Sequence, residues 1–200
     1  MEDTRERFID ATAALFTQRG YAASGLKQIS GASTATIGSL YHFFPGGKAA
    51  LAAETLTRSG QAYQELVEAV IDAAPDVVTG VRDCFDGAAE TLRASGYADA
   101  CPIATVALEV ASADEALRQV TEQIFASWLR SITDRLVNGG VPESRAPELA
   151  TVLLAALEGG FLLSRVAKDA AAMDVLGATV VDLVRHAVDG SGFVPERRRM

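Results

Sequence analysis

The stretch STATIGSLYHFFPGGK, Ser33 to Lys48, combines small residues, hydroxyls and aromatic rings and contains no carboxylate. Thr36 is suited to cap a helix that runs to about Phe44, because its hydroxyl can accept a hydrogen bond from a free backbone N–H. The Pro-Gly-Gly sequence that follows ends this helix, and a long helix is expected to start near Lys48. Two further short helices precede the stretch, so the N-terminus is predicted to form a helix-turn-helix.

The rest of the chain also has apolar residues at helical spacing. Further helices are expected over 48–73, 76–94, 102–112, 114–138, 144–167 and 171–189, and no alternating strand pattern competes with them. The predicted fold is therefore all-α. It divides into an N-terminal three-helix domain (1–47), a larger helical domain for ligand binding and dimerisation (48–190), and a basic tail (191–200) that is expected to be frayed.

Charge is distributed unevenly along the chain. The 200 residues carry a net charge of −8, yet no Asp or Glu stands between Asp10 and Glu54, while Arg19, Lys27 and Lys48 lie within that run. A mildly cationic, acid-free face on an acidic protein is what a polyanionic partner requires. The last helix of a helix-turn-helix enters the major groove of DNA, and the hydroxyls of Thr34, Thr36, Ser39 and Tyr41 are donors for phosphates or bases.

Other classes of function find little support. Cys84 and Cys101 are expected to be free thiols, because neither metal-ligand spacing nor clustered histidines accompany them. No metal or other cofactor is predicted. An enzyme would have to use Cys101 with His42 or His186, and no catalytic motif links these residues. The apolar run Ala150–Ser164 contains a glutamate and is shorter than a membrane span, so a buried helix in a cytoplasmic protein is expected.

Residues 3–51, and above all IGSLYHFFPGGKAAL, resemble the DNA-binding domain of the tetracycline-repressor (TetR) family of transcriptional regulators. The matching parts are Gly20-Tyr21, Ile29, the G-x-L-Y-x-x-F pattern that starts at Gly38, and Lys48. The later stretches Ala100–Glu109 and Ala156–Asp169 resemble the LmrA/YxaF-like branch of that family. The resemblance implies a homodimer that binds a near-palindromic operator and is usually released by a small effector, here expected to be largely apolar.

The resemblance also implies roles for individual residues. Tyr41, His42 and Lys48 match phosphate-binding positions, and Ser24 or Gly25 stands where the second helix often meets the DNA backbone. The full predicted set of DNA contacts is Ser24, Lys27, Thr34, Thr36, Ile37, Ser39, Tyr41, His42 and Lys48. Two positions depart from the family pattern: Thr34 replaces a turn glycine, which predicts a strained or altered turn, and Ile37 replaces a common lysine.

The larger domain is expected to hold a ligand pocket and a dimer interface. Larger or softer side chains of the middle helices are the pocket candidates: Phe85, Tyr97, Cys101, Leu108, Phe125, Trp128, Leu129 and Phe161. Two apolar helix faces are expected to close a four-helix bundle with a second chain, through Leu153, Ala156, Leu157, Gly160, Leu176, Val180, Leu183 and Val184. Packing of these faces within one chain remains the alternative.

Two questions stay open in the sequence. Glu109 and Glu158 each interrupt an apolar run, and each is expected to face a ligand, pair with an arginine such as Arg165, or reach solvent. The departures at Thr34 and Ile37 leave open an alternative function. In it, the protein is a helical dimer that acts as an interaction module, and its helix-turn-helix (the reading head) no longer binds DNA.

Overall fold

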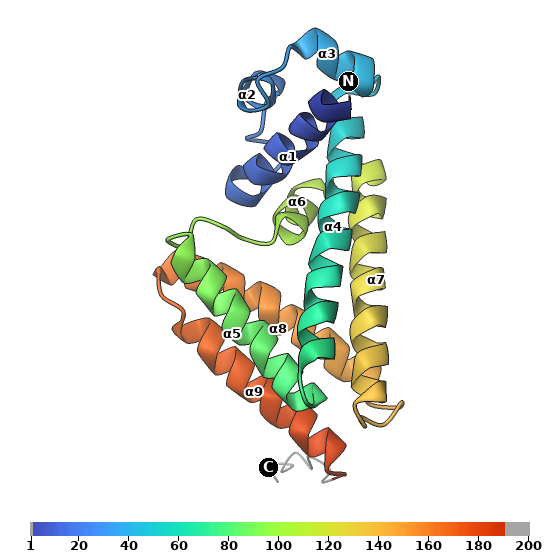
Figure 1. Cartoon of the computed structure of the whole chain (residues 1–200), viewed down its shortest axis with the longest axis vertical. Coiled ribbons are helices and arrows are strands. Elements are labelled where there is room, and N and C mark those ends of the chain that lie inside the picture. The colour runs from blue at the N-terminus through green and yellow to red at the C-terminus, as the bar shows by residue number, and fades with distance from the viewer. Residues whose placement is uncertain (1, 191–200) are drawn as a thin grey trace. The chain divides into compact units, whose positions relative to one another are not determined.

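In a computed structural model of the chain, the described residues, 2–190, form helices joined by turns and contain no strand (Figure 1). The helices are α1 (Glu2–Arg19), α2 (Leu26–Ala32), α3 (Ile37–Phe43), α4 (Gly47–Ala73), α5 (Val77–Ala94), α6 (Pro102–Val110), α7 (Glu115–Asn138), α8 (Ala146–Ala167) and α9 (Ala171–Val188). The all-α prediction is confirmed, and the helix ends fall within a few residues of those expected from the sequence.

The chain forms two compact units. Unit 1 contains the residues up to Glu65 together with Ala98–Ser127, and unit 2 contains Leu66–Tyr97 and the residues from Trp128 onward. The long helices α4 and α7 each contribute to both units, and α6 belongs to unit 1 with the three N-terminal helices. The domain boundary predicted after residue 47 stays a prediction, and the predicted basic tail lies outside the described residues.

A small apolar core holds α1, α2 and α3 together in unit 1. It contains Phe8, Ile9, Ile29, Leu40, Phe44 and Leu51, all buried. The rings of Phe8 and Phe44 meet edge to face with their centroids 6.4 Å apart, a favourable aromatic geometry. Leu40 and Phe44 thus anchor α3 to α1.

The caps of the two short helices are set locally. Thr36 is the N-cap of α3, and its Oγ1 accepts a hydrogen bond of 3.1 Å from the backbone N–H of Ser39, which confirms the predicted cap. Gly25 is the N-cap of α2, and its N–H donates to Gln28 Oε1 at 2.8 Å. Ser24, one residue earlier, is not the cap.

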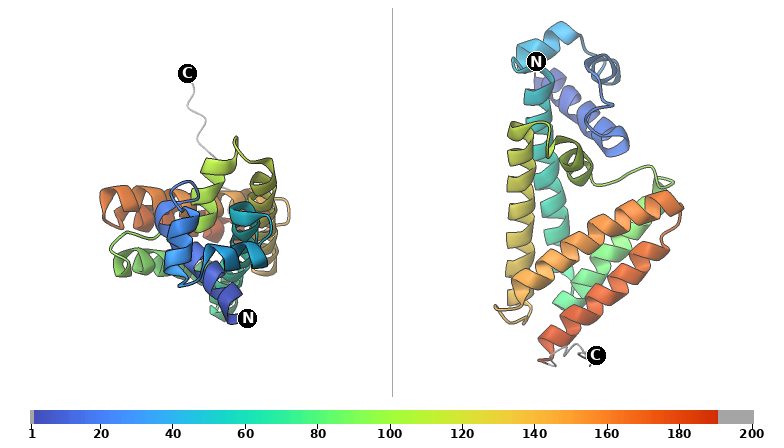
Figure 2. Two further views of the ribbon diagram at one scale, coloured as in Figure 1. Left: turned by 90° about the horizontal axis from the view of Figure 1, so that it is seen from above. Right: turned by 180° about the vertical axis from the view of Figure 1, so that it is seen from behind.

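The core of unit 2 lies among α5, α8 and α9, which run side by side in the right-hand view of Figure 2. Small residues bring the helices together. A Cβ on Gly177 of α9 would lie 2.8 Å from Phe85 Cβ, and one on Gly160 of α8 would lie 2.7 Å from Met173 Sδ. Glycine at these two positions therefore permits the close packing of α9 against both neighbours.

Half of the predicted dimer interface is contradicted by burial within the chain, and the other half stays a prediction. Leu153, Gly160, Val180 and Val184 are buried inside unit 2, and Ala156, Leu157, Leu176 and Leu183 pack partly buried against the same core. The physical reason is that α8 and α9 pack on each other and on α5 through these faces. The alternative of packing within one chain is therefore the correct one for the four buried residues.

An apolar face of α8 remains exposed on the other side of the helix. It consists of Val152, Leu162, Leu163 and Val166, with the small residues Ala155 and Gly159 between them. Among the described residues, α8 is the one helix long and apolar enough to cross a membrane. The expectation of a buried helix was therefore only half right, because one face is buried in the core and the other is not.

The turn before α3 carries the strain that its sequence suggested. Thr34 has φ +53°, in the left-handed region where a β-branched side chain costs about 1–2 kcal/mol relative to glycine. Its hydroxyl accepts a hydrogen bond of 2.8 Å from Arg7 Nη1 and donates one of 2.7 Å to the carbonyl of Ser33.

We expect Thr34→Gly to be more stable than Thr34→Ala by about 1 kcal/mol, because both lose the hydroxyl but only glycine removes the left-handed strain. Thermal or denaturant unfolding of the two variants measures the difference. Equal stabilities would show that the backbone at residue 34 is not left-handed.

Candidate nucleic-acid interface

The outward face of α3 carries most of the predicted DNA contacts. Ile37 is 37% exposed and Tyr41, one turn further on, is 50% exposed, and His42 is also exposed. Thr36 is exposed at the start of the helix, where its Oγ1 lies 2.9 Å from Ser39 Oγ. Because Thr36 and Ser39 bond each other and the helix start, their hydroxyls are held in fixed positions at the N-terminal end of α3.

Two carboxylates near the acid-free segment, Glu6 and Glu54, are paired with arginines. Glu54 of α4 pairs with Arg5 of α1 and with Arg58, and Arg58 also pairs with Glu6. These pairs join α1 to α4 and offset the negative charges nearest to the three-helix region. Lys27 of α2 is exposed, so its charge faces solvent in unit 1.

Ser24 is wrongly predicted as a DNA contact. Its side chain is fully buried, and its hydroxyl donates a hydrogen bond of 2.6 Å to the carbonyl of Gly20. The residue closes the turn after α1 rather than facing outward. Its local role was hidden in the sequence because a serine just before a short helix is also the pattern of an N-cap.

Lys48 lies at the start of α4, as predicted, and is already engaged by the protein. Its Nζ donates a hydrogen bond of 2.6 Å to the carbonyl of Tyr21 and lies 4.0 Å from the centre of the Tyr21 ring. Burial lowers the pKa of Lys48 below its usual value, and the charge of Glu109 opposes that shift. An ammonium has three donors, so a phosphate contact by Lys48 stays a prediction.

Glu109 of α6 is a part of this region that the sequence did not reveal. Its Oε1 accepts a hydrogen bond of 3.1 Å from the N–H of Tyr21, and its Oε2 accepts one of 2.5 Å from the N–H of Ala22. Its partners are backbone amides, which none of the three roles considered for Glu109 included, while its side chain is only half-buried. The partners are 87 and 88 residues away in sequence, so no local pattern indicates the contact.

The predicted pocket residues are distributed over both units. Cys101, Leu108 and Phe125 belong to unit 1, and Phe85, Tyr97, Trp128, Leu129 and Phe161 belong to unit 2. Cys101 is buried and caps α6, and Leu108 is 81% exposed, which is contrary to a place in a pocket wall. Phe85 and Trp128 are buried, and Tyr97, Leu129 and Phe161 are partly buried against the core of unit 2.

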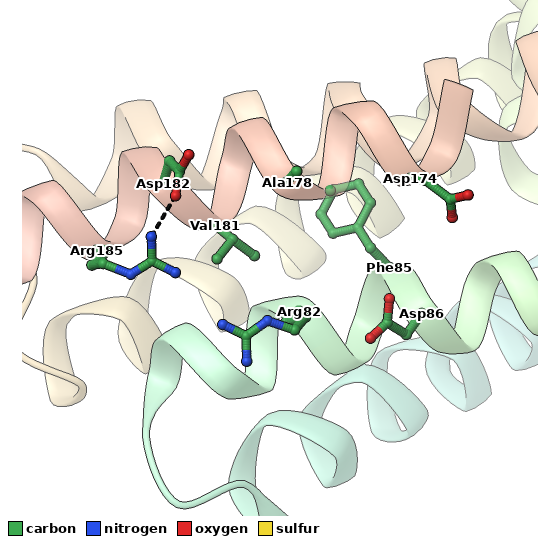
Figure 3. Close-up of a pocket in the computed structure, with 9 residues that line it drawn as sticks. Arg82, Phe85, Asp86, Asp174, Ala178, Val181, Asp182 and Arg185 are labelled. Carbon is green, nitrogen blue, oxygen red and sulfur yellow. Dashed lines mark hydrogen bonds and ion pairs between the residues drawn. The ribbon is translucent and has the colours of Figure 1, made fainter. Parts of the chain in front are cut away.

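A cleft of about 370 Å³ lies between α5 and α9 of unit 2 (Figure 3). Its floor is apolar and includes Phe85 and Val181, and its rim carries the charged side chains of Arg82, Asp86, Asp174, Asp182 and Arg185. Arg185 pairs with Asp182 across one turn of α9. Because the rim is charged and Phe85 is the one predicted pocket residue that lines it, this cleft does not match the apolar pocket expected from the sequence.

Comparisons with known proteins assign the two parts of the chain. Residues 8–55 match the model of bacterial regulatory proteins of the tetR family, and residues 77–179 match that of the LmrA/YxaF-like regulator C-terminal domain. The chain belongs to the TetR family of transcriptional regulators. The predicted family and its LmrA/YxaF-like branch are thereby confirmed.

Individual relatives of this regulator agree with the assignment. The chain is 33% identical to YxaF of Bacillus subtilis, an uncharacterised HTH-type regulator, over 92% of this chain and 96% of that protein. It is 31% identical to the HTH-type regulator LmrA of the same organism over 92% and 98%. A TetR-family regulator from Agrobacterium tumefaciens has the same fold, with a TM-score of 0.80 at 19% identity over 91% of this chain and 97% of that one.

Members of the family bind operator DNA, typically as repressors, and act as dimers. They are transcriptional regulators rather than enzymes. The proposed catalytic use of Cys101 with a histidine is thereby rejected. Burial in unit 2 also raises the pKa of the Cys84 thiol to about 12, so this cysteine is not an activated nucleophile.

Mutation of Ser24 tests whether its hydroxyl stabilises the turn or contacts DNA. Ser24→Ala should lower the free energy of unfolding by about 1 kcal/mol, since a buried carbonyl loses its partner. The slope of the logarithm of the DNA association constant against the logarithm of the salt concentration should stay unchanged, because Ser24 contacts no phosphate. Lys27→Ala is the matched variant of α2: if Lys27 contacts a phosphate, the slope falls by about 0.9. A reduced slope for Ser24→Ala would instead show that Ser24 contributes to a DNA contact.

Proposed function

We propose that this regulator is a repressor that binds a near-palindromic operator as a homodimer and is released by a small, largely apolar effector in the cytoplasm. The observation that supports it best is the exposed face of α3, which lacks carboxylates and begins at a capped, fixed N-terminus. Family membership supplies the operator and the dimer in general terms.

Each residue of this face has a proposed part in DNA binding. The N-terminal end of α3 enters the major groove, where Thr36, Ile37 and Ser39 meet base edges. Ile37 offers a methyl surface to thymine and no charge. Tyr41 and His42, further along the exposed face, bind phosphates together with Lys27. Thr34 and Lys48 are proposed as further backbone contacts, with the protein bonds described above retained.

The proposed dimer interface is the exposed face of α8. Leu162 is 60% and Val166 80% exposed in the single chain, and a Cβ at Gly159 would meet nothing within 4 Å. An exposed apolar stripe of this length is a typical interaction site, and small residues within it let a second helix approach closely. A second copy of the chain is the proposed occupant, because the family acts as dimers.

The effector is proposed to act by differential affinity. A ligand shifts the equilibrium between two conformations only as far as it prefers one of them. The remaining candidates for its pocket are Phe125 of unit 1 and the buried or partly buried Phe85, Tyr97, Trp128, Leu129 and Phe161 of unit 2. A compound that binds the protein and leaves its DNA affinity unchanged is not the effector.

Titration of the protein against duplexes from the region upstream of its own gene, or against fragments selected from the genome, tests the DNA-binding function. We expect specific binding that weakens steeply with salt and falls several-fold for Tyr41→Phe, which keeps the ring and removes only the hydroxyl. Binding without preference over scrambled DNA, in the selection as well, would favour the alternative of a helical interaction module.

The dimer interface is tested by Val166→Arg, which places a charge on the exposed face of α8. We expect the mass in solution to fall from twice 21.0 kDa to 21.0 kDa and DNA affinity to fall by at least about 100-fold, as the second half-site no longer contributes. Leu66→Arg, a similar change at an exposed leucine of α4, is the control and should stay dimeric. A dimeric Val166→Arg variant would contradict the proposed interface.

A further inference from the structure

Residues 20–25, here called the Tyr21 turn, join α1 to α2. The helix that follows α2, α3, carries the exposed residues proposed to bind DNA, here called the reading face. The Tyr21 turn begins with Gly20 at φ +76°, which ends α1, and it finishes at Gly25, the N-cap of α2. The apolar core also holds α2 and α3 to α1, so the three helices form one head. Contacts that the turn makes with α4 and α6 therefore help to orient this head as a whole.

Glu109 holds the turn from the side of α6. Its two carboxylate oxygens accept hydrogen bonds from consecutive backbone amides, those of Tyr21 and Ala22. Hydrogen bonds to an ionised group are stronger than neutral ones, and two of them to one turn fix its orientation as well as its distance. The approach is close, since a Cβ on Gly20 would lie 1.8 Å from Glu109 Oε1.

Lys48 holds the same residue from the side of α4. Its ammonium donates to the carbonyl of Tyr21 and lies over the Tyr21 ring. The peptide groups on both sides of Tyr21 are thus bound by opposite charges: a carboxylate at the N–H and an ammonium at the C=O. Local charge is balanced, so the carboxylate of Glu109 adds no net negative charge to the acid-free region.

Glu109 is the member of this contact that comes from beyond the helix-turn-helix and its following helix. It lies on α6, which starts soon after the chain passes from unit 2 back into unit 1 at Ala98. Lys48, in contrast, belongs to the helix that directly continues from α3. Glu109 therefore ties the Tyr21 turn to α6, which belongs to the later segment of unit 1.

We propose that Glu109 is a positioning residue that fixes the spacing of operator half-sites that the dimer accepts. This inference rests on the proposed function, since it needs a dimer that binds a two-fold operator. In a dimer, the two reading helices match one separation of half-sites. When Glu109 no longer binds the Tyr21 turn, the two reading heads of the dimer can fit half-sites over a wider range of separations. No phosphate contact is lost.

The stability of the fold is not the main contribution of this contact. Ala22 is exposed, so water replaces the carboxylate at its amide when Glu109 is removed. Loss of Glu109 thus leaves the apolar core of Phe8, Ile29, Leu40 and Phe44 intact and changes chiefly the orientation of the turn. A specificity measurement separates this effect from a general loss of stability.

The experiment compares full-length wild type with Glu109→Gln and Glu109→Ala on duplexes that share the same selected half-sites and differ only in the spacer, by −2 to +2 base pairs. We expect the wild type to prefer one spacer. The variants should bind that duplex roughly tenfold more weakly, because a loosened head must be ordered on binding, and should discriminate among the spacers at least about fivefold less. Their slope with salt should match that of the wild type.

Two variants serve as matched controls. Leu108→Gln introduces the same side chain at the neighbouring exposed position of α6, and Glu122→Gln removes the same charge from an exposed glutamate of unit 1 that pairs with Arg118. Both should keep the spacer preference of the wild type. Gly20→Ala, whose Cβ displaces the carboxylate, should weaken spacer discrimination as Glu109→Ala does, and combining the two should add no further loss.

The possible results distinguish the positioning role of Glu109 from the proposed DNA-binding function. An unchanged spacer preference in folded Glu109 variants overturns the positioning role. A reduced slope with salt also overturns it, because Glu109 would then act on a phosphate contact of Lys48 instead. If the wild type binds no duplex specifically, the proposed function fails, and the positioning role fails with it.

Discussion

The backbone of Tyr21 is bound on both sides by charged side chains from other helices, and our proposal makes the position of the three N-terminal helices depend on this contact. Glu109 binds the N–H of Tyr21 and Lys48 binds its C=O. Both bonds are charge-assisted and partly shielded from water, where such bonds are stronger than at an open surface. Glycine at position 20 is required beside them, because any side chain would occupy the place of the carboxylate.

The same contact explains how an acidic protein keeps a surface suited to DNA. The chain as a whole carries a charge of −8, yet three carboxylates of unit 1 are used internally: Glu6 and Glu54 by arginines, and Glu109 by backbone amides beside Lys48. The outward face of α3 is left with hydroxyl, aromatic and aliphatic groups. Its contacts to DNA therefore depend on shape and hydrogen bonding more than on a dense positive charge.

Features determined by neighbouring residues were predictable from the sequence. The cap at Thr36, the end of α3 before Pro45 and the anchoring of Leu40 and Phe44 all follow from patterns within a few residues. The strain at Thr34 was indicated by the family pattern and agrees with its positive φ. These features, with the helix ends, established both the all-α fold and the helix-turn-helix.

Features that depend on distant partners were not predictable. The role of Glu109 requires two amides 87 and 88 residues away, whereas a glutamate in an apolar run can equally face solvent, an arginine or a ligand. Four of the residues predicted for the dimer face are buried within the chain. Because α8 is apolar on both sides, its periodicity does not tell whether Leu153 or Val166 is exposed. Ser24 was misassigned because its hydroxyl bonds backward to Gly20 instead of forward into α2.

Amide hydrogen exchange of the wild-type protein, resolved at individual residues, tests the central contact most directly. Tyr21 and Ala22 lie outside α1 and α2, and amides in such turns ordinarily exchange quickly unless they are bonded. We predict that both are protected to an extent comparable with the ends of the adjoining helices, and that Glu109→Gln removes this protection while α3 keeps its own. Rapid exchange of both amides in the wild type would contradict this contact, because the turn would then not be held by Glu109.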